Sequence, residues 1–203
     1  HLCRVSTAAG VQLLRQAKAE GLNVTADVSI NSLHLTEMDI GYYDTNARLN
    51  PPLRQARDRD ALAAALADGT VDALVSDHSP VAADAKQLPF AEAEAGATGL
   101  ELLLPLALKW GQAAGGPGVL RAVQTITSGA ARVLGPALGT LQASCGHLAE
   151  GAVADVCVVD PAARWQVTPE ALRSQGKHTP FAGHEMTGRV RHTLVAGHMA
   201  HGA

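Results

Sequence analysis

An aspartate and a histidine directly follow an apolar run in the segment Val71-Asp72-Ala73-Leu74-Val75-Ser76-Asp77-His78-Ser79-Pro80. The run is typical of a buried parallel strand, and α/β proteins carry their chemistry at the carboxyl ends of such strands. The Asp77 carboxylate can act as a general base or bind a hard metal ion, and the His78 imidazole can bind a metal or contact a substrate. We therefore predict a site at this strand end, with Asp77 as its catalytic residue and His78 as a substrate contact.

The elements that would position this site alternate between strand and helix. Apolar residues alternate from Val24 to Ile30, which predicts a strand. Amphipathic patterns predict helices over 8–20, 55–67, 99–112 and 119–134, with Ser6 or Thr7 as the first cap and Gly21 as the first stop. Strands and helices at this spacing predict parallel βα units and therefore an α/β fold.

The pattern changes after Leu138. Short apolar segments separated by glycines predict antiparallel strands at 139–141, 146–151 and 154–160, and a strand pair over 190–199 that turns at Ala196-Gly197-His198. We therefore predict a domain boundary near residue 139. Residues 1–138 form the βα part, and residues 139–203 form a small β part with a tail.

The composition of the 203 residues argues against two classes of partner. A formal net charge of −3 gives no excess of cations for phosphate, and an aromatic content of 3% leaves little for base stacking. No apolar run reaches transmembrane length. We therefore expect no nucleic-acid partner and no membrane partner.

The three cysteines, Cys3, Cys145 and Cys157, have no paired spacing. An odd number of such cysteines predicts free thiols in a reducing cytoplasm. Cys3 is expected to be a small buried side chain rather than a nucleophile, because no base is evident beside it. The chain starts at His1, within a strand-like segment that reaches Val5, so we expect a fragment of a longer protein.

Four further motifs occur in register with the Asp77 strand end, and together the five resemble the dihydroorotase family of cyclic amidohydrolases. The four are Asn46-Ala47-Arg48-Leu49-Asn50-Pro51-Pro52-Leu53-Arg54, Ala95-Gly96-Ala97-Thr98-Gly99-Leu100-Glu101, Gly146-His147-Leu148-Ala149-Glu150-Gly151-Ala152-Val153-Ala154-Asp155 and Thr179-Pro180-Phe181-Ala182-Gly183. The resemblance covers essentially the whole chain, in order, and corresponds to roughly the second half of such a protein.

The resemblance implies the C-terminal half of a metal-dependent (β/α)8 TIM-like barrel, about strands 5 to 8, followed by part of a small β-sandwich. The family interconverts N-carbamoyl-aspartate and dihydroorotate in pyrimidine synthesis, where zinc activates the attacking water and polarises the scissile carbonyl. Asn50 resembles the asparagine that contacts the pyrimidine ring, which makes it a candidate substrate-binding residue. Asp77 matches the aspartate of strand 8.

Three positions depart from the family pattern. Arg4 and Ser32 stand where strands 5 and 6 carry metal-binding histidines, and Val81 replaces the histidine that contacts the substrate carboxylate. A guanidinium has no lone pair for zinc. At about 4 Å and an effective dielectric of about 20, it would repel a divalent ion by about 8 kcal/mol. A serine hydroxyl is a poor zinc ligand, so Asp77 is the only candidate ligand that the visible strands retain.

Two histidines, His34 and His1, lie near these positions in the sequence. His34 would face the same side as Ser32 on a continuing strand, and it could replace the lost ligand only if that strand shifts or bends. His1 lies three residues before Arg4, on the opposite face of the strand.

The leading hypothesis is a catalytically defective, cytoplasmic dihydroorotase homologue that is oligomeric and supports the assembly of aspartate carbamoyltransferase. No metal or cofactor is expected in this chain in that case. The alternative is an active dihydroorotase, in which zinc is held by a His-x-His upstream of this chain, with Asp77 as general base and Asn50 holding the ring. A third hypothesis is an amidohydrolase for another cyclic amide such as a hydantoin, against which the Asn-Pro-Pro-Leu-Arg segment argues.

Overall fold

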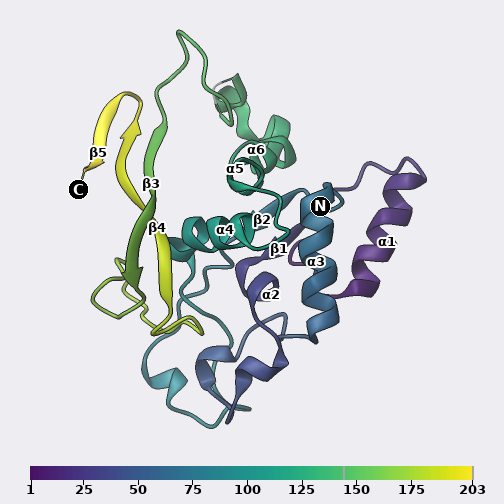
Figure 1. Cartoon of the computed structure of the whole chain (residues 1–203), viewed down its shortest axis with the longest axis vertical. Helices are drawn as coiled ribbons and strands as arrows, with labels where there is room; N and C mark the ends of the chain where they lie inside the picture. Colours follow the sequence, from purple (N-terminus) through teal and green to yellow (C-terminus); the bar gives the residue numbers. More distant parts are fainter. Residues whose placement is uncertain (144, 203) are drawn as a thin grey trace.

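The computed structural model describes residues 1–143 and 145–202. It is a mixed α/β structure, with a short parallel sheet among the helices of the first part and a long antiparallel sheet in the second (Figure 1). The predicted α/β class is confirmed.

The parallel sheet pairs β1 (Asp27–Ser29) with β2 (Ala73–Val75), and Asp27 lies opposite Ala73. Leu2 makes a parallel bridge to Ala26, so the start of the chain runs beside β1. The three carboxyl ends therefore point toward the same edge, as the alternating pattern predicted.

Two helices flank these strands and end where the sequence indicates. Helix α1 (Ala8–Ala19) starts at Thr7, whose hydroxyl accepts a hydrogen bond from the Gly10 amide at 3.0 Å. Helix α3 (Ala56–Asp68) ends at Gly69, which adopts the left-handed conformation with φ of 86°. Both ends follow the usual capping chemistry.

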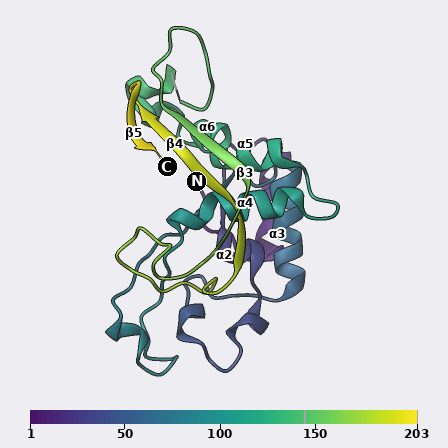
Figure 2. The ribbon, with the colours of Figure 1, turned by 60° about the vertical axis from the view of Figure 1, so that its left-hand side comes forward.

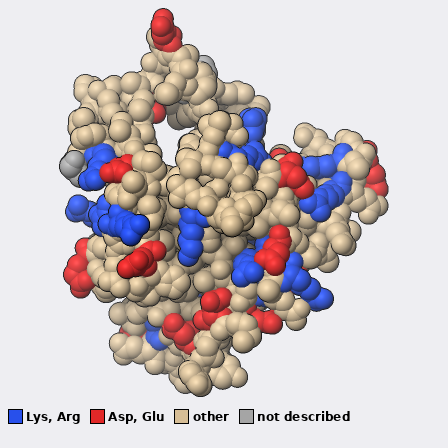
Figure 3. All heavy atoms as spheres, viewed as in Figure 1, with Lys and Arg blue, Asp and Glu red and all other residues tan. Residues whose placement is uncertain are grey.

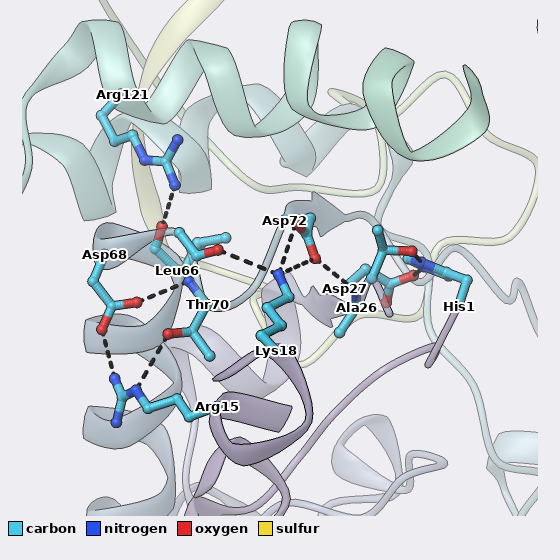
Figure 4. A network of polar contacts seen from close by, with 12 residues as sticks. His1, Arg15, Lys18, Ala26, Asp27, Leu66, Asp68, Thr70, Asp72 and Arg121 are labelled. Atoms are coloured by element: carbon cyan, nitrogen blue, oxygen red, sulfur yellow. Dashed lines mark hydrogen bonds and ion pairs between the residues drawn. The ribbon is translucent and has the colours of Figure 1, made fainter. Parts of the chain in front are cut away.

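Polar contacts join these elements at the opposite edge of the parallel sheet (Figure 4). The Lys18 ammonium group donates to both carboxylate oxygens of Asp72 at 2.9 Å, and Asp72 also accepts the Ala26 amide at 2.8 Å. Arg15 pairs with Asp68 at 2.6 Å. Helix α1 is thereby tied to β1 and to the segments that flank β2.

Three of the elements predicted for residues 1–138 differ from the structure. The strand predicted to reach Ile30 stops at Ser29, because the Ser29 hydroxyl accepts the Ser32 amide and starts the short helix α2 (Ile30–His34). The helix predicted over 119–134 is divided at Thr127 into α5 (Val119–Ile126) and α6 (Ser128–Leu134). The predicted helix over 99–112 is present as a 3₁₀ turn, Leu100–Leu102, followed by α4 (Leu103–Gln112).

The antiparallel sheet has the order β3-β4-β5, formed by Val156–Gln166, Glu185–Val195 and His198–Gly202. Figure 2 shows it as long strands beside α4. The predicted turn between the last two strands is confirmed, since Ala196 and Gly197 both have positive φ. The strands predicted at 139–141 and 146–151 are wrong, because glycines with positive φ divide this stretch into 3₁₀ turns (Gly135–Ala143) and loops.

The two sheets share one hydrophobic core, because α4 packs against β4 and also against α2 and α5. Val167 and Met186 from the second part belong to the same cluster of buried residues as Leu106 and Val28 from the first. The domain boundary near residue 139 stays a prediction.

The remaining short elements are three 3₁₀ turns in the loops, Glu37–Ile40, Thr45–Ala47 and Asp84–Lys86. On the face shown in Figure 3, acidic and basic side chains are intermixed. Within the described residues, none of the helices has the length and apolar character needed to cross a lipid bilayer.

Candidate active site

The carboxyl ends of the parallel strands bring together three of the residues singled out from the sequence. The Arg4 guanidinium donates from Nη1 to the Asp77 carboxylate at 3.2 Å and to the Asn50 carbonyl oxygen at 2.8 Å. The Asp77 side chain is only 10% exposed, whereas that of Arg4 is 40% exposed. A guanidinium therefore lies against the acidic group that the sequence marked as catalytic.

The backbone is strained at this point. Arg4 and Asp77 both adopt left-handed conformations, with φ of 55° and 49°. Such a conformation costs a non-glycine residue about 1–2 kcal/mol, and residues held this way cluster at functional sites. The two strained residues end the strands on either side of β1, which marks this edge as the candidate site.

His78 lies behind Asp77 and supports the chain that follows. Its Nδ1 accepts hydrogen bonds from the amides of Gly99 and Leu100, both at 3.2 Å. These amides open the 3₁₀ turn that leads into α4. Only Nε2 of this half-buried ring is left for a substrate, and a role of His78 in substrate binding stays a prediction.

Ser32 and His34 lie on α2 instead of on a strand. Ser32 is buried, and its hydroxyl lies 3.4 Å from that of Ser29. The His34 ring turns into the core, donates from Nε2 to the Leu106 carbonyl oxygen at 2.9 Å and meets Phe181 edge to face. Burial lowers the pKa of His34 to about 4. The chain does bend after Ser29, but α2 turns the His34 side chain toward α4 and so away from the role of a substitute ligand.

Val81 is buried beside a glycine-containing loop. A methyl group added at Gly96 would lie 2.9 Å from the Val81 side chain and 2.5 Å from the Ser79 carbonyl oxygen. A methyl group added at Gly99 would lie even closer to the Ser76 carbonyl oxygen. The motif Ala95–Glu101 therefore needs its glycines because it packs directly on the chain that carries Asp77.

Replacing Gly99 by alanine is expected to lower the free energy of unfolding by about 1–3 kcal/mol, because the new methyl group would overlap backbone atoms of Ser76. Chemical denaturation followed by circular dichroism measures this change. The matched control is Gly10→Ala in α1, where the added methyl group meets only side-chain atoms at 3.2 Å. A Gly99→Ala protein as stable as the Gly10→Ala protein would contradict the interpretation.

Asn50 is exposed and contacts the site through its backbone carbonyl group, which accepts from Arg4. It precedes Pro51 in a cis peptide bond. A contact between the Asn50 side chain and a substrate stays a prediction.

The residues at this mouth do not fit the zinc ion that the resemblance implies. Arg4 offers no lone pair, and its positive charge lies where a cation beside Asp77 would have to bind. Ser32 offers a hydroxyl, and the Nδ1 atom of His78 is already used by two backbone amides. Asp77 is therefore the single metal-binding group that these positions retain.

A second polar cluster lies on the same strands, and sequence reasoning missed it. His1 contacts Asp27 through Nε2 at 2.9 Å and the Thr25 hydroxyl through Nδ1 at 2.8 Å. Burial raises the pKa of Asp27, and the hydrogen bond from the Arg4 amide only partly offsets this effect. Cys3 is exposed and lies beside this pair. The expectation of a buried Cys3 without a neighbouring base is therefore wrong. The sequence does contain a signal for this cluster, because Asp27 is an acidic residue within the apolar run of residues 24–30.

The sequence motifs that lie far apart along the chain meet near the site. His178 contacts the Asn46 side chain at 3.0 Å, and its carbonyl oxygen accepts the Thr98 amide at 2.7 Å. The Thr98 hydroxyl donates to the Gly176 carbonyl oxygen at 2.7 Å. Two of the motifs and the segment directly before Thr179–Gly183 thus belong to one packed structure.

Known proteins share the sequence pattern and the fold of this chain. Residues 2–201 match the amidohydrolase family along nearly the whole chain. The chain belongs to the amidohydrolase family. Among solved structures, the L-hydantoinase (dihydropyrimidinase) of Arthrobacter aurescens is similar to this amidohydrolase, with a TM-score of 0.86 and 28% sequence identity over 98% of this chain and 44% of that one. A D-hydantoinase from Thermus sp. has a TM-score of 0.85 at 24% identity, which shows a common fold alone.

Among curated relatives, this amidohydrolase is 43% identical to the dihydroorotase of Anaeromyxobacter dehalogenans (strain 2CP-1 / ATCC BAA-258), over 99% of this chain and 45% of that protein. It is 40% identical to the dihydroorotase of Geobacter sp. (strain M21), over 100% of this chain and 46% of that protein. The predicted resemblance to the dihydroorotase family is confirmed. The chain spans about half the length of these relatives.

Proposed function

We propose that this chain is the C-terminal half of a dihydroorotase-like barrel protein of pyrimidine biosynthesis that has lost hydrolytic activity. Its identity of about 40% to dihydroorotases supports the family and the pathway. The loss of activity is proposed from the side chains at the strand ends, above all from the contact between Arg4 and Asp77.

The contact between Arg4 and Asp77 carries this proposal. By the family resemblance, Arg4 stands where a metal-binding histidine is expected, and its guanidinium pairs with the Asp77 carboxylate at 3.2 Å. The guanidinium hydrogen-bonds an oxygen of the carboxylate that a metal ion or a substrate would otherwise contact. A zinc ion beside Asp77 would be repelled by the positive charge of Arg4.

The neighbouring positions support the same conclusion. Ser32 is buried and paired with Ser29, and Val81 is buried against the Gly96 loop. A serine hydroxyl is a poor zinc ligand compared with an imidazole, and the Val81 side chain has no donor for a substrate carboxylate. His34, the nearest imidazole to Ser32 in sequence, donates to α4.

The hydrolysis of dihydroorotate by the zinc-loaded full-length protein tests the proposal. We expect no turnover above that of the uncatalysed reaction and no change on replacing Asp77 by asparagine. An active dihydroorotase measured in parallel provides the positive control. Turnover that disappears in the Asp77→Asn protein would contradict the proposal and favour the alternative, an active zinc-dependent enzyme with Asp77 as general base. The retained and largely buried Asp77 is the observation that favours this alternative.

We propose further that the protein supports the assembly of aspartate carbamoyltransferase, by analogy with non-catalytic members of the family. A protein without hydrolytic activity in this family is best explained by a structural role. Sedimentation of the full-length protein mixed with aspartate carbamoyltransferase of the same organism should give one joint boundary. Two independent boundaries would contradict this role.

A further inference from the structure

A polar cluster on the parallel strands is separate from the contact between Arg4 and Asp77. One ring nitrogen of His1, the Cys3 sulfur and one carboxylate oxygen of Asp27 all lie within 4.8 Å of one another. We propose that these three side chains bind a zinc ion. This inference does not depend on the loss of hydrolytic activity proposed above.

Strand geometry brings the three side chains together. Leu2 pairs with Ala26, so His1 and Cys3 share a strand face with Asp27, because successive side chains alternate. Ala26 and Val28, on the other face, are fully buried in the hydrophobic core. The cluster therefore lies on the side of the strands that faces away from this part of the core.

The separations of the ligand atoms suit one ion. Bonds of about 2.0–2.3 Å to a tetrahedral zinc ion place neighbouring ligand atoms about 3.4–3.6 Å apart. His1 Nε2 and Asp27 Oδ2 are 2.9 Å apart and would separate slightly. Cys3 is exposed and free, so a small rotation can bring its sulfur closer.

Neighbouring groups already orient two of the ligands. The Thr25 hydroxyl contacts His1 Nδ1 at 2.8 Å, which directs Nε2 toward Asp27. The Arg4 amide donates to Asp27 Oδ1 at 2.7 Å, which leaves Oδ2 for the ion. Hydrogen bonds of this kind from outside the ligand set hold histidine and carboxylate ligands in place in metal sites. The Arg4 guanidinium, by contrast, is directed to Asp77 and Asn50.

The three ligand groups, from His1, Cys3 and Asp27, determine which metal ion is favoured and how its charge is neutralised. A thiolate, an imidazole and a carboxylate together favour zinc over magnesium or calcium, which prefer oxygen ligands. Zinc binds the thiolate, so the Cys3 thiol proton is released to solvent when the ion binds. Thiolate and carboxylate then carry two negative charges, which a divalent ion neutralises beside the buried Asp27.

A cobalt(II) titration of the full-length protein, followed by visible and near-ultraviolet absorption, tests this site. We expect a thiolate-to-cobalt charge-transfer band that saturates at about one ion per chain and disappears when zinc is added. Cys3→Ser should abolish the band and weaken zinc binding by about tenfold or more. Because Cys3 is exposed, this variant should fold normally, which its circular dichroism verifies.

Two control variants make the result specific. Cys157→Ser removes another exposed thiol, on β3, and should leave the band unchanged. Asp77→Asn removes the acidic group at the mouth and should also leave it unchanged. The proposal is overturned by a wild-type protein without the band, by a band that survives Cys3→Ser, or by a band lost in either control. Turnover lost in Asp77→Asn would instead contradict the proposed function, so the two failures are distinguishable.

Discussion

Replacing Phe181 by alanine is expected to lower the free energy of unfolding by about 3–5 kcal/mol. The Phe181 side chain is only 1% exposed and is among the largest fully buried side chains. It meets the rings of His34 and His184 edge to face, at centroid distances of 6.4 and 5.7 Å. Its removal would leave a cavity in the core that joins α2 to the loop before β4.

Denaturation of the full-length protein by urea, followed by circular dichroism and fluorescence, measures this loss. Phe90→Ala is the matched control, because Phe90 is only half-buried, in a loop where it contacts Arg48 and Tyr43. We expect a clearly smaller loss of stability for the control. Equal losses for the two variants would mean that Phe181 does not join these elements. The motif Thr179–Gly183 would then need an explanation other than packing.

Lowering the pH from 6.5 to 4 is expected to remove up to about 3 kcal/mol of stability through His34 alone. Burial is the main cause, and it lowers the pKa of this imidazole from 6.5 to about 4. Between these values the unfolded chain binds a proton at His34 and the folded chain does not. The free energy of unfolding therefore falls as the pH falls through this window, and the His34 contribution is fully present above pH 6.5.

Two variants separate titration from hydrogen bonding at this position. His34→Leu removes both the proton-binding group and the donor to the Leu106 carbonyl oxygen, whereas His34→Gln keeps a donor and does not titrate. Urea denaturation at several pH values should show a shallower pH dependence between 6.5 and 4 for both variants than for wild type. If either variant keeps the wild-type pH dependence, protonation of His34 is not its cause.

Local chemistry explains which elements could be predicted. Thr7 and Gly69 mark helix ends because their preferences act within a few residues. The strand before Asp77 was evident from its apolar run and the polar residues that follow it. The strand over 24–30 was predicted too long, because the Ser29 cap competes with β structure through a local hydrogen bond. The strands predicted at 139–141 and 146–151 failed because glycines allow positive φ that no apolar pattern reveals.

The sequence by itself determined the family, the α/β class and the identity of the residues at the strand ends. The substitutions at Arg4, Ser32 and Val81 are visible without coordinates, because they concern only which residue type stands at each position. Only the tertiary structure decided which groups meet. Arg4 pairs with Asp77 across 73 positions of the chain, and His1 pairs with Asp27 across 26. The parallel register of the strands sets these contacts. It arises from pairing between distant segments, which local sequence preferences do not encode.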